Sequence, residues 1–249
     1  LNFIRAIQAI YTSVMSCVRA NNNISDMFEC PKCLRQGCVL SPTLFSVIIN
    51  EVAVRVSIQG RHGVQLVPGM IELLIMLFAD DIALLSCSPI GLQNQLNLLH
   101  NMCQELDLNI NTDKTKVMVF RHGGFLGRYE RWHVDGQPLE VVNSYVYLGY
   151  KFTTTMSSVE AAKHLAGKGR RAVHNVLKAH SQLRQITTKS FFKMFDSMVQ
   201  PVLSYCAELW GPLIDADKDP TEKIHLLACK RLLNGATRTP NRLVYGELR

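Results

Sequence analysis

The sequence predicts an α+β fold, and three observations carry that prediction. Apolar runs of strand length, separated by short turns, fall before about residue 152. After that point apolar residues recur at the three- and four-residue steps of helices. The 249 residues are 47% hydrophobic and 19% charged, which suits a folded core and makes wholesale disorder unexpected. Strands followed by helices are typical of α+β proteins.

The first part of the chain is expected to hold two helices separated by a hairpin. Apolar residues at helical spacing over residues 3–14 predict an amphipathic helix. The asparagines at 21–23 supply the turn of a short hairpin. Ser41 and Pro42 predict the start of a second helix, because Ser accepts a backbone N–H at the N-cap and Pro fits the first helical position.

The middle of the chain is expected to hold a strand hairpin, a helix and further strands. Residues 71–78 and 82–86 are apolar runs separated by Asp80 and Asp81, so two carboxylates mark the hairpin tip. A helix is predicted over residues 92–106 and ends at Asp107, since Asp tolerates a left-handed conformation. Residues 116–120 and 141–152 predict further strands.

From Ser157 onward the chain is predicted to be helical. Ser157 and Glu160 have the spacing of a capping box. One face of this helix is apolar, with Ala162, Leu165, Ala166, Val173, Val176 and Leu177. A different stripe is basic, with Lys163, Arg170, His174 and Lys178.

Charge divides the chain into a neutral half and a basic half. Residues 1–150 hold 11 Lys and Arg against 12 Asp and Glu, whereas residues 151–249 hold 16 against 8. This pattern favours a catalytic body beside a surface that binds a polyanion. A basic helix that is simply solvated explains the charge equally well.

No membrane span or secretion signal is expected. The most apolar run, residues 71–85, contains Glu72 and the Asp80-Asp81 pair, which a bilayer would penalise heavily. The chain opens inside an amphipathic pattern without a signal peptide, and its lack of an initial Met predicts a start partway through a larger reading frame. We therefore expect an intracellular protein of the cytoplasm or nucleus.

The eight cysteines are expected to be reduced thiols. Cys30 and Cys33 form a Cys-x-x-Cys pair near Cys38, a pattern that can begin a zinc site. Structural zinc sites need four ligands, and no second pair or suitably spaced His follows. The pair is therefore interpreted as incidental.

Four motifs follow one another along the chain and make up the candidate site. They are Leu34–Pro42 entering a helix, Phe78–Asp81 between two strands, Leu108–Lys116 after a helix, and Tyr147–Gly149 inside a strand. Hard carboxylate oxygens on a tight turn suit Mg²⁺, which takes one or two carboxylates plus substrate phosphates. Two such ions can activate a 3′-hydroxyl and stabilise a leaving pyrophosphate. An isolated Asp-Asp turn is more often an ordinary solvated hairpin tip.

Two of the motifs contain further candidate residues for the site. Gly37 permits close approach of the backbone to a ligand, with Gln36 able to hydrogen-bond beside it. A turn that caps the next helix explains Gly37 equally well. Lys114 is a flexible cation that can reach a phosphate, although a lone lysine is more often a surface residue.

In this order the motifs resemble the reverse transcriptases of non-LTR retrotransposons, over essentially the whole chain. The match is sharpest at the segments that resemble the family's motifs B, C, D and E: Arg35–Pro42, Phe78–Ser86, Asn109–Phe120 and Tyr147–Gly149. The resemblance implies a partial right-hand polymerase palm, an antiparallel sheet with helices, over residues 1–152 and a mostly helical, thumb-like region over residues 153–249. It implies RNA-directed DNA synthesis from dNTP on an RNA template and a DNA primer, with Mg²⁺ or Mn²⁺.

The resemblance also implies roles for single residues. Asp80 and Asp81 match the aspartates that hold the metal ions, and Lys114 matches the lysine that assists pyrophosphate departure. The residues matching the nucleotide and template site are Gln36, Gly37, Phe78 and Ala79. Leu148 and Gly149 match the turn that supports the primer end. The residues expected to grip the nucleic-acid backbone are Lys163, Arg170, Arg171 and Lys178.

One departure from the family changes the expected activity. The chemistry needs a third carboxylate, which the family supplies in motif A, ahead of the stretch that this chain matches. The only Asp before Asp80 is Asp26, in a polar hairpin that does not match motif A. We therefore expect a fragment that lacks an N-terminal part of the same polyprotein and does not polymerise DNA alone.

Two other classes of protein stay open. One is a catalytically dead remnant that still binds nucleic acid, and the other is a host protein that reuses the basic helices as an RNA-binding module. The upstream aspartate discriminates them from an enzyme, since a binding module does not need it. A group II intron maturase fits the motif wording at residues 78–86 and 109–120 less well.

Overall fold

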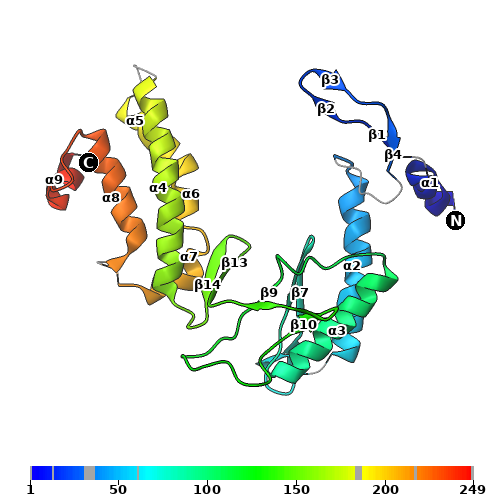
Figure 1. Cartoon of the computed structure of the whole chain (residues 1–249). Coiled ribbons are helices and arrows are strands. Elements are labelled where there is room, and N and C mark those ends of the chain that lie inside the picture. The colour runs from blue at the N-terminus through cyan, green and yellow to red at the C-terminus, as the bar shows by residue number, and fades with distance from the viewer. Residues whose placement is uncertain are drawn as a thin grey trace. The chain divides into compact units, whose positions relative to one another are not determined.

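The computed structural model describes residues 2–12, 14–30, 37–60, 62–182, 187–215 and 218–247 (Figure 1). Within this part of the chain the fold is α+β, and its packing divides into two units. The first unit contains Leu1–Thr112 and Arg128–Pro138, and the second contains Asp113–Gly127 and Leu139–Arg249. This division of packing groups the strands after Leu139 with the helices that follow them. The boundary at residue 152, drawn from the motifs, stays a prediction.

The first unit opens with a short helix and two paired ladders. Helix α1 spans Asn2–Tyr11, β1 (Met15–Ser16) pairs with β4 (Phe28–Glu29), and β2 (Arg19–Ala20) pairs with β3 (Asn23–Ile24). The expected asparagine turn is confirmed, because Asn21 and Asn22 have φ of 48° and 65°. Two left-handed residues between paired strands form the turn whose twist suits a hairpin, and Asn tolerates that conformation.

Helix α2 spans Leu40–Gln59 and begins two residues earlier than the sequence indicated. The expected N-cap at Ser41 is wrong, since Val39 is the N-cap residue and makes no side-chain capping bond. Ser41 already lies in the first turn, and its buried hydroxyl hydrogen-bonds the Tyr11 hydroxyl at 2.8 Å instead. The side chain thus ties α2 to the end of α1.

The core of the first unit lies between α2, helix α3 (Pro89–Glu105) and the strand pair β7 (Ile75–Phe78) and β8 (Asp81–Leu84). Its buried residues are Val52, Val56, Leu74, Leu99, Met102 and Cys103. At the rim, Arg55 of α2 donates to the Glu105 carboxylate of α3 at 2.7 Å. Strands β5 (Val64–Val67) and β6 (Ile71–Leu73) pair beside this core.

The ends of α3 are fixed by local hydrogen bonds that the sequence indicated in part. Ser88 caps the start, where its hydroxyl accepts the Gly91 N–H at 3.0 Å. Asp107 ends the helix with φ of 59°, as expected. The N–H of Asp107 donates to Gln104 and that of Leu108 donates to Cys103. This bond pair is the Schellman arrangement that closes helices at a left-handed residue.

Helix α2 is also the one described helix long and apolar enough to cross a membrane by length and composition. Only 22% of its apolar stretch is buried within the described structure, and the buried part lies in the core of the first unit. Val52 and Val56 are fully buried against β7 and α3. Glu51 and Arg55 form an ion pair on its exposed side at 3.0 Å.

The second unit packs its helices around the long helix α4 (Ser158–Gln182). The helices that follow are α5 (Thr188–Met198), α6 (Gln200–Leu203), α7 (Ala207–Trp210), the 3₁₀ turn η1 (Gly211–Leu213), α8 (Pro220–Leu232) and α9 (Asn241–Glu247). The apolar face expected on α4 is confirmed as the centre of this core. The buried cluster consists of Ala166, Val173, Val176, Phe191, Phe195, Val199, Leu203, Ile224 and Ala228.

Only one of the two hydrogen bonds of the expected capping box is present at the start of α4. The Ser157 hydroxyl accepts the Glu160 N–H at 3.4 Å, as the spacing predicts. The return bond is absent, because the Ser157 N–H donates to Thr153 Oγ1. Glu160 instead pairs with Lys163 at 2.8 Å and with Lys151 at 3.5 Å.

Two strand predictions need correction. Strand β9 covers only Lys116–Val117 and pairs in parallel with β12 (Glu140–Val141). The expected strand at 141–152 is a hairpin of β13 (Ser144–Tyr147) and β14 (Tyr150–Thr153). Its two-residue turn is made by Leu148 and Gly149, with φ of 48° and 86°. The apolar pattern continued through these positions and so predicted a strand, whereas the family resemblance had placed a turn at Leu148 and Gly149.

The expected antiparallel sheet is present only as separate ladders. Among the described residues the strands pair two by two, and the remaining pair is β10 (His133–Val134) with β11 (Gln137–Pro138). Every strand is two to four residues long. Trp132 fastens this last hairpin to α3 through its indole N–H, which donates to the Pro89 carbonyl at 3.0 Å.

Two glycines on α4 provide a matched test of this packing. A Cβ on buried Gly169 would overlap Leu203 Cδ2 and lie 3.0 Å from its Cγ, and Leu203 is fixed in the core. We expect Gly169→Ala to lower the free energy of unfolding by about 1–2 kcal/mol through overpacking. Exposed Gly167 has open space around it. Gly167→Ala should therefore raise the free energy of unfolding by up to about 1 kcal/mol. Urea denaturation measures the free energy of unfolding of both variants. Equal changes in the two variants would contradict the packing of Gly169 against Leu203.

Candidate functional site

The Asp80-Asp81 pair lies at the tip of the β7–β8 hairpin. Phe78 pairs with Asp81 across the hairpin, which leaves Ala79 and Asp80 as a two-residue turn. Ala79 has φ of 53°, a conformation that costs energy for a residue with a Cβ. The expected carboxylate tip is therefore present, and the core behind it holds it in place.

The register of the hairpin decides which side chains face away from the core. The pairs Ile75–Leu84 and Leu77–Ile82 share one face, and Ile75, Ile82 and Leu84 pack against the core of the first unit. Because side chains alternate along a strand, the pairs Met76–Ala83 and Phe78–Asp81 share the other face. Phe78 is 60% exposed, and both aspartates are exposed.

Both carboxylates at this tip are available to a cation. In the part of the chain that the structure describes, neither the Asp80 nor the Asp81 carboxylate forms a hydrogen bond or ion pair with another residue. Across the same residues no group of three or more His, Cys, Asp or Glu side chains could hold a metal ion. Two adjacent carboxylates still match the donors of Mg²⁺, which completes its shell with water and phosphate oxygens.

The segment before α2 carries the second motif. Gln36 and Cys33 lie outside the described residues, so the structure adds nothing to their predicted roles. Gly37 is exposed with φ of 81°, and a Cβ there would meet open space. Its left-handed conformation explains the choice of glycine. The open surroundings leave room for a ligand at the backbone.

Cys38 has an unusual environment that sequence reasoning missed. The Tyr11 hydroxyl lies 3.6 Å from its sulfur. Hydrogen bonds from Tyr11, from the Ser41 hydroxyl and from the N–H groups of Leu40 and Ser41 lower the pKa of the Cys38 thiol to about 6. The start of α2 thus favours the thiolate at neutral pH.

Lys114 lies exposed in the turn before β9, where the sequence placed it. Its turn belongs to the second unit, whereas the Asp80-Asp81 hairpin belongs to the first. Its neighbour along the chain, Lys116, is committed to an ion pair with Glu140 at 2.6 Å. The role of Lys114 in pyrophosphate departure stays a prediction.

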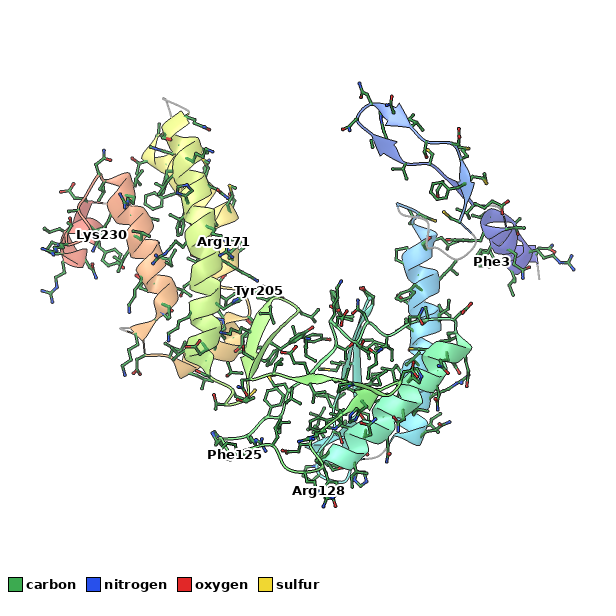
Figure 2. The ribbon with its side chains drawn as sticks, viewed as in Figure 1. Phe3, Phe125, Arg128, Arg171, Tyr205 and Lys230 are labelled. Carbon is green, nitrogen blue, oxygen red and sulfur yellow. The ribbon has the colours of Figure 1, made fainter. Side chains whose placement is uncertain are left out.

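Leu148 and Gly149 form a turn that two distant residues hold. The Tyr205 hydroxyl donates to the Leu148 carbonyl at 2.6 Å. The Lys168 ammonium of α4 donates to the Gly149 carbonyl at 3.3 Å. Figure 2 shows Tyr205 beside the β13–β14 hairpin. Neither contact could be read from the sequence, because nothing in its spacing links these residues to the turn.

The exposed side of α4 is basic, as expected. Arg170, Arg171 and Lys178 are exposed, and Arg171 projects from α4 in Figure 2. Lys163 is also exposed but is paired with Glu160. Burial, together with the nearby charges of Lys168, Lys151 and Arg171, lowers the pKa of the His164 imidazole. Such a concentration of cations suits phosphate.

An exposed carboxylate pair in the first unit and a basic helix face in the second are features that nucleic-acid-binding proteins share. The family model of the reverse transcriptases (RNA-dependent DNA polymerases) matches residues 2–152. The chain belongs to the reverse transcriptase family, which confirms the resemblance read from the motifs, and its relatives confirm the non-LTR retrotransposon type.

Two relatives are similar over part of their length. A transposon-derived protein of Caenorhabditis elegans is 30% identical over 168 residues, which cover 66% of this chain and 58% of that protein. The Pol polyprotein of the type-1 retrotransposable element R2 from Popillia japonica is 27% identical over 128 residues. That match covers 49% of this chain and 21% of the polyprotein. The chain therefore spans well under two thirds of either relative.

The environment of Cys38 predicts selective alkylation. With its pKa lowered to about 6, the thiol should react with iodoacetamide at a rate that is half-maximal near that pH. An ordinary thiol needs about pH 8.5. Tyr11→Phe removes the largest cause, so the midpoint should move upward. Peptide mapping by mass spectrometry at several pH values measures it, and a midpoint near 8.5 in the unsubstituted chain would contradict the assigned hydrogen bonds.

Proposed function

We propose that this chain is an incomplete part of the catalytic domain of an RNA-directed DNA polymerase of a non-LTR retrotransposon. The observation that carries the proposal is the exposed Asp80-Asp81 tip of β7–β8, which lies within the segment matched by the reverse transcriptase family. Its partners are an RNA template, a DNA primer and dNTP, and its location is intracellular. The reaction joins a deoxynucleotide to the primer 3′-hydroxyl.

Asp80 and Asp81 would hold the divalent metal, Mg²⁺ or Mn²⁺. When bound, the metal activates the 3′-hydroxyl and stabilises the charge of the leaving pyrophosphate. The carboxylates contribute fixed negative charge at the end of a strand pair that the core holds rigid, so little reorganisation is needed. Phe78 and Ala79 complete the tip, and Ala79 gives the turn its left-handed bend.

The other residues would bind and orient the substrates. Gln36 and Gly37 contact the incoming nucleotide and the template, where the glycine leaves the backbone open. Lys114 supplies positive charge, and a proton, as pyrophosphate departs. Leu148 and Gly149 support the primer end.

The basic side of α4 would hold the nucleic-acid backbone without reading its sequence. The contacts proposed are those of Lys163, Arg170, Arg171 and Lys178, of which Lys163 must exchange its Glu160 partner for phosphate. Charge of this kind gives affinity that depends on salt. It also fits a nucleic-acid-binding module without catalysis, so catalysis needs its own test.

The metal site proposed here requires a third oxygen ligand. Asp26 is exposed in the segment between β3 and β4 and is not part of a paired strand, so it does not fit that role. We expect no Mg²⁺-dependent primer extension by the 249-residue polypeptide alone. A longer reading frame with an aspartate at the end of an apolar strand upstream should be active on an RNA template with a DNA primer.

In that longer protein, Asp80→Asn and Asp81→Asn should each lower kcat at least about 100-fold, because a lost metal ligand removes several kcal/mol of transition-state stabilisation. Asp26→Asn is the matched control and should retain activity. Extension of a labelled primer measures the rates. Full activity in both hairpin variants would refute the metal role. Inactivity of the unsubstituted longer protein, with nucleic-acid binding intact, would leave the binding module as the function.

The basic side of α4 gives a separate prediction. Lys178→Gln and Arg170→Gln should each weaken binding of an RNA–DNA duplex and reduce the slope of log K against log salt by about 1. Lys218→Gln is the control, since Lys218 lies outside α4 and pairs with Asp215 at 2.8 Å. Fluorescence anisotropy at several salt concentrations measures the slope. Equal slopes of log K against log salt for all three variants would mean that the duplex does not bind the basic side of α4.

A further inference from the structure

The turn of the β13–β14 hairpin is held by both of its carbonyls. Leu148 O accepts from Tyr205 Oη at 2.6 Å, and Gly149 O accepts from Lys168 Nζ at 3.3 Å. Tyr205 follows α6 and Lys168 lies on α4, so the two donors come from different elements of the same unit. The carbonyls of a tight turn are normally hydrated. Two side-chain donors on this one therefore indicate that the turn is held in a defined position.

The Tyr205 ring also packs on the turn. A Cβ built on Gly149 would lie 3.4 Å from Tyr205 Cε1 and 3.7 Å from its Cζ. The ring therefore lies against the open side of the glycine, and the hydroxyl reaches past it to the preceding carbonyl. A Cβ at these distances would make only ordinary van der Waals contact with the ring, so the left-handed φ of 86° is the reason for glycine at this position.

Tyr205 is itself fixed to the body of the second unit. Its carbonyl accepts the Trp210 indole N–H at 2.9 Å. Trp210 is 3% exposed and packs with Ala162 and Leu165 of α4. Tyr150, the first residue of β14, packs against the same cluster. Through Trp210 and Tyr150, the donor and the hairpin are thus both linked to α4.

We propose that Tyr205 and Lys168 are positioning residues for the primer terminus. They fix the peptide planes of Leu148 and Gly149, so that the turn meets the primer 3′ end in one orientation. The Leu148 side chain is 38% exposed. This inference rests on the proposed function, in which that turn supports the primer, and it adds the residues that hold the turn.

A purely structural role for Tyr205 would have different consequences. Tyr205 is 43% exposed, so loss of its hydroxyl should leave the core intact. A positioning role affects only binding that depends on the primer end. Lys168 also carries charge that attracts any nucleic acid, so its control must lose the same charge at another place on α4. Lys178→Gln meets that requirement, and Tyr145→Phe on exposed β13 is the control for Tyr205→Phe.

The first measurement follows the turn without nucleic acid. Hydrogen exchange of the full chain, read by mass spectrometry at peptides covering residues 147–151, reports opening of the hairpin. Tyr205→Phe should speed exchange there by roughly threefold to tenfold, as expected for one net hydrogen bond. Exchange in β7–β8 should not change, nor should either region in Tyr145→Phe. Unchanged exchange at 147–151 would overturn the proposed anchoring.

The second measurement compares two duplexes of equal length with the full chain. One has a recessed primer 3′ end over an RNA template, and the other is blunt. The unsubstituted chain should prefer the recessed end. Tyr205→Phe and Lys168→Gln should reduce that preference by roughly threefold to tenfold. Blunt-duplex affinity should be unchanged in Tyr205→Phe and equally weakened in Lys168→Gln and Lys178→Gln, because these two lose one charge each.

The possible outcomes distinguish failure of this inference from failure of the proposed polymerase function. Preference for the recessed end that persists in Tyr205→Phe and Lys168→Gln would overturn the positioning role and leave the polymerase proposal standing. Absence of any preference in the unsubstituted chain would overturn the primer role of the turn, and the positioning role with it. A reduced preference in Lys178→Gln equal to that in Lys168→Gln would assign the effect to charge alone and overturn the role of Lys168.

Discussion

Burial of one face of the β7–β8 hairpin is the constraint on which the candidate site depends. Ile75, Ile82 and Leu84 pack against the core formed with α2 and α3, and a shift of one residue would exchange the two faces. The register therefore directs Asp81 and Phe78 away from the core together. Apolar burial behind the hairpin supplies the rigidity that a metal site needs from its ligands.

In the second unit a helix, α4, has one buried face and one exposed face, as the β7–β8 hairpin does in the first unit. Helix α4 buries Val173 and Val176 against the neighbouring helices and leaves its cations on the outside. The same helix contributes Lys168 to the turn at Gly149. This one helix thus packs the core, presents exposed positive charge and supports a hairpin.

Local signals in the sequence predicted much of this fold and failed where a residue had a distant partner. The asparagine turn, the left-handed end at Asp107 and the carboxylate tip all depend on neighbours within a few residues, and all were predicted. Ser41 was expected to cap α2, but its hydroxyl bonds Tyr11. The apolar run through Leu148 predicted an unbroken strand, and only the family resemblance indicated the turn there, since Leu rarely adopts a left-handed conformation. Tyr205 and Cys38 gave no signal, because their partners are set by the fold.

The sequence by itself determined the family, the order of the motifs, the amphipathic face of α4 and the excess of positive charge in the second half. These follow from residue identity and spacing, which local periodicity records. Only the tertiary structure decided which face of β7–β8 stays open, how packing divides the chain and which side chains hold the Leu148–Gly149 turn. Such contacts join residues far apart in the chain, and they exist only after burial of apolar surface has brought those residues together.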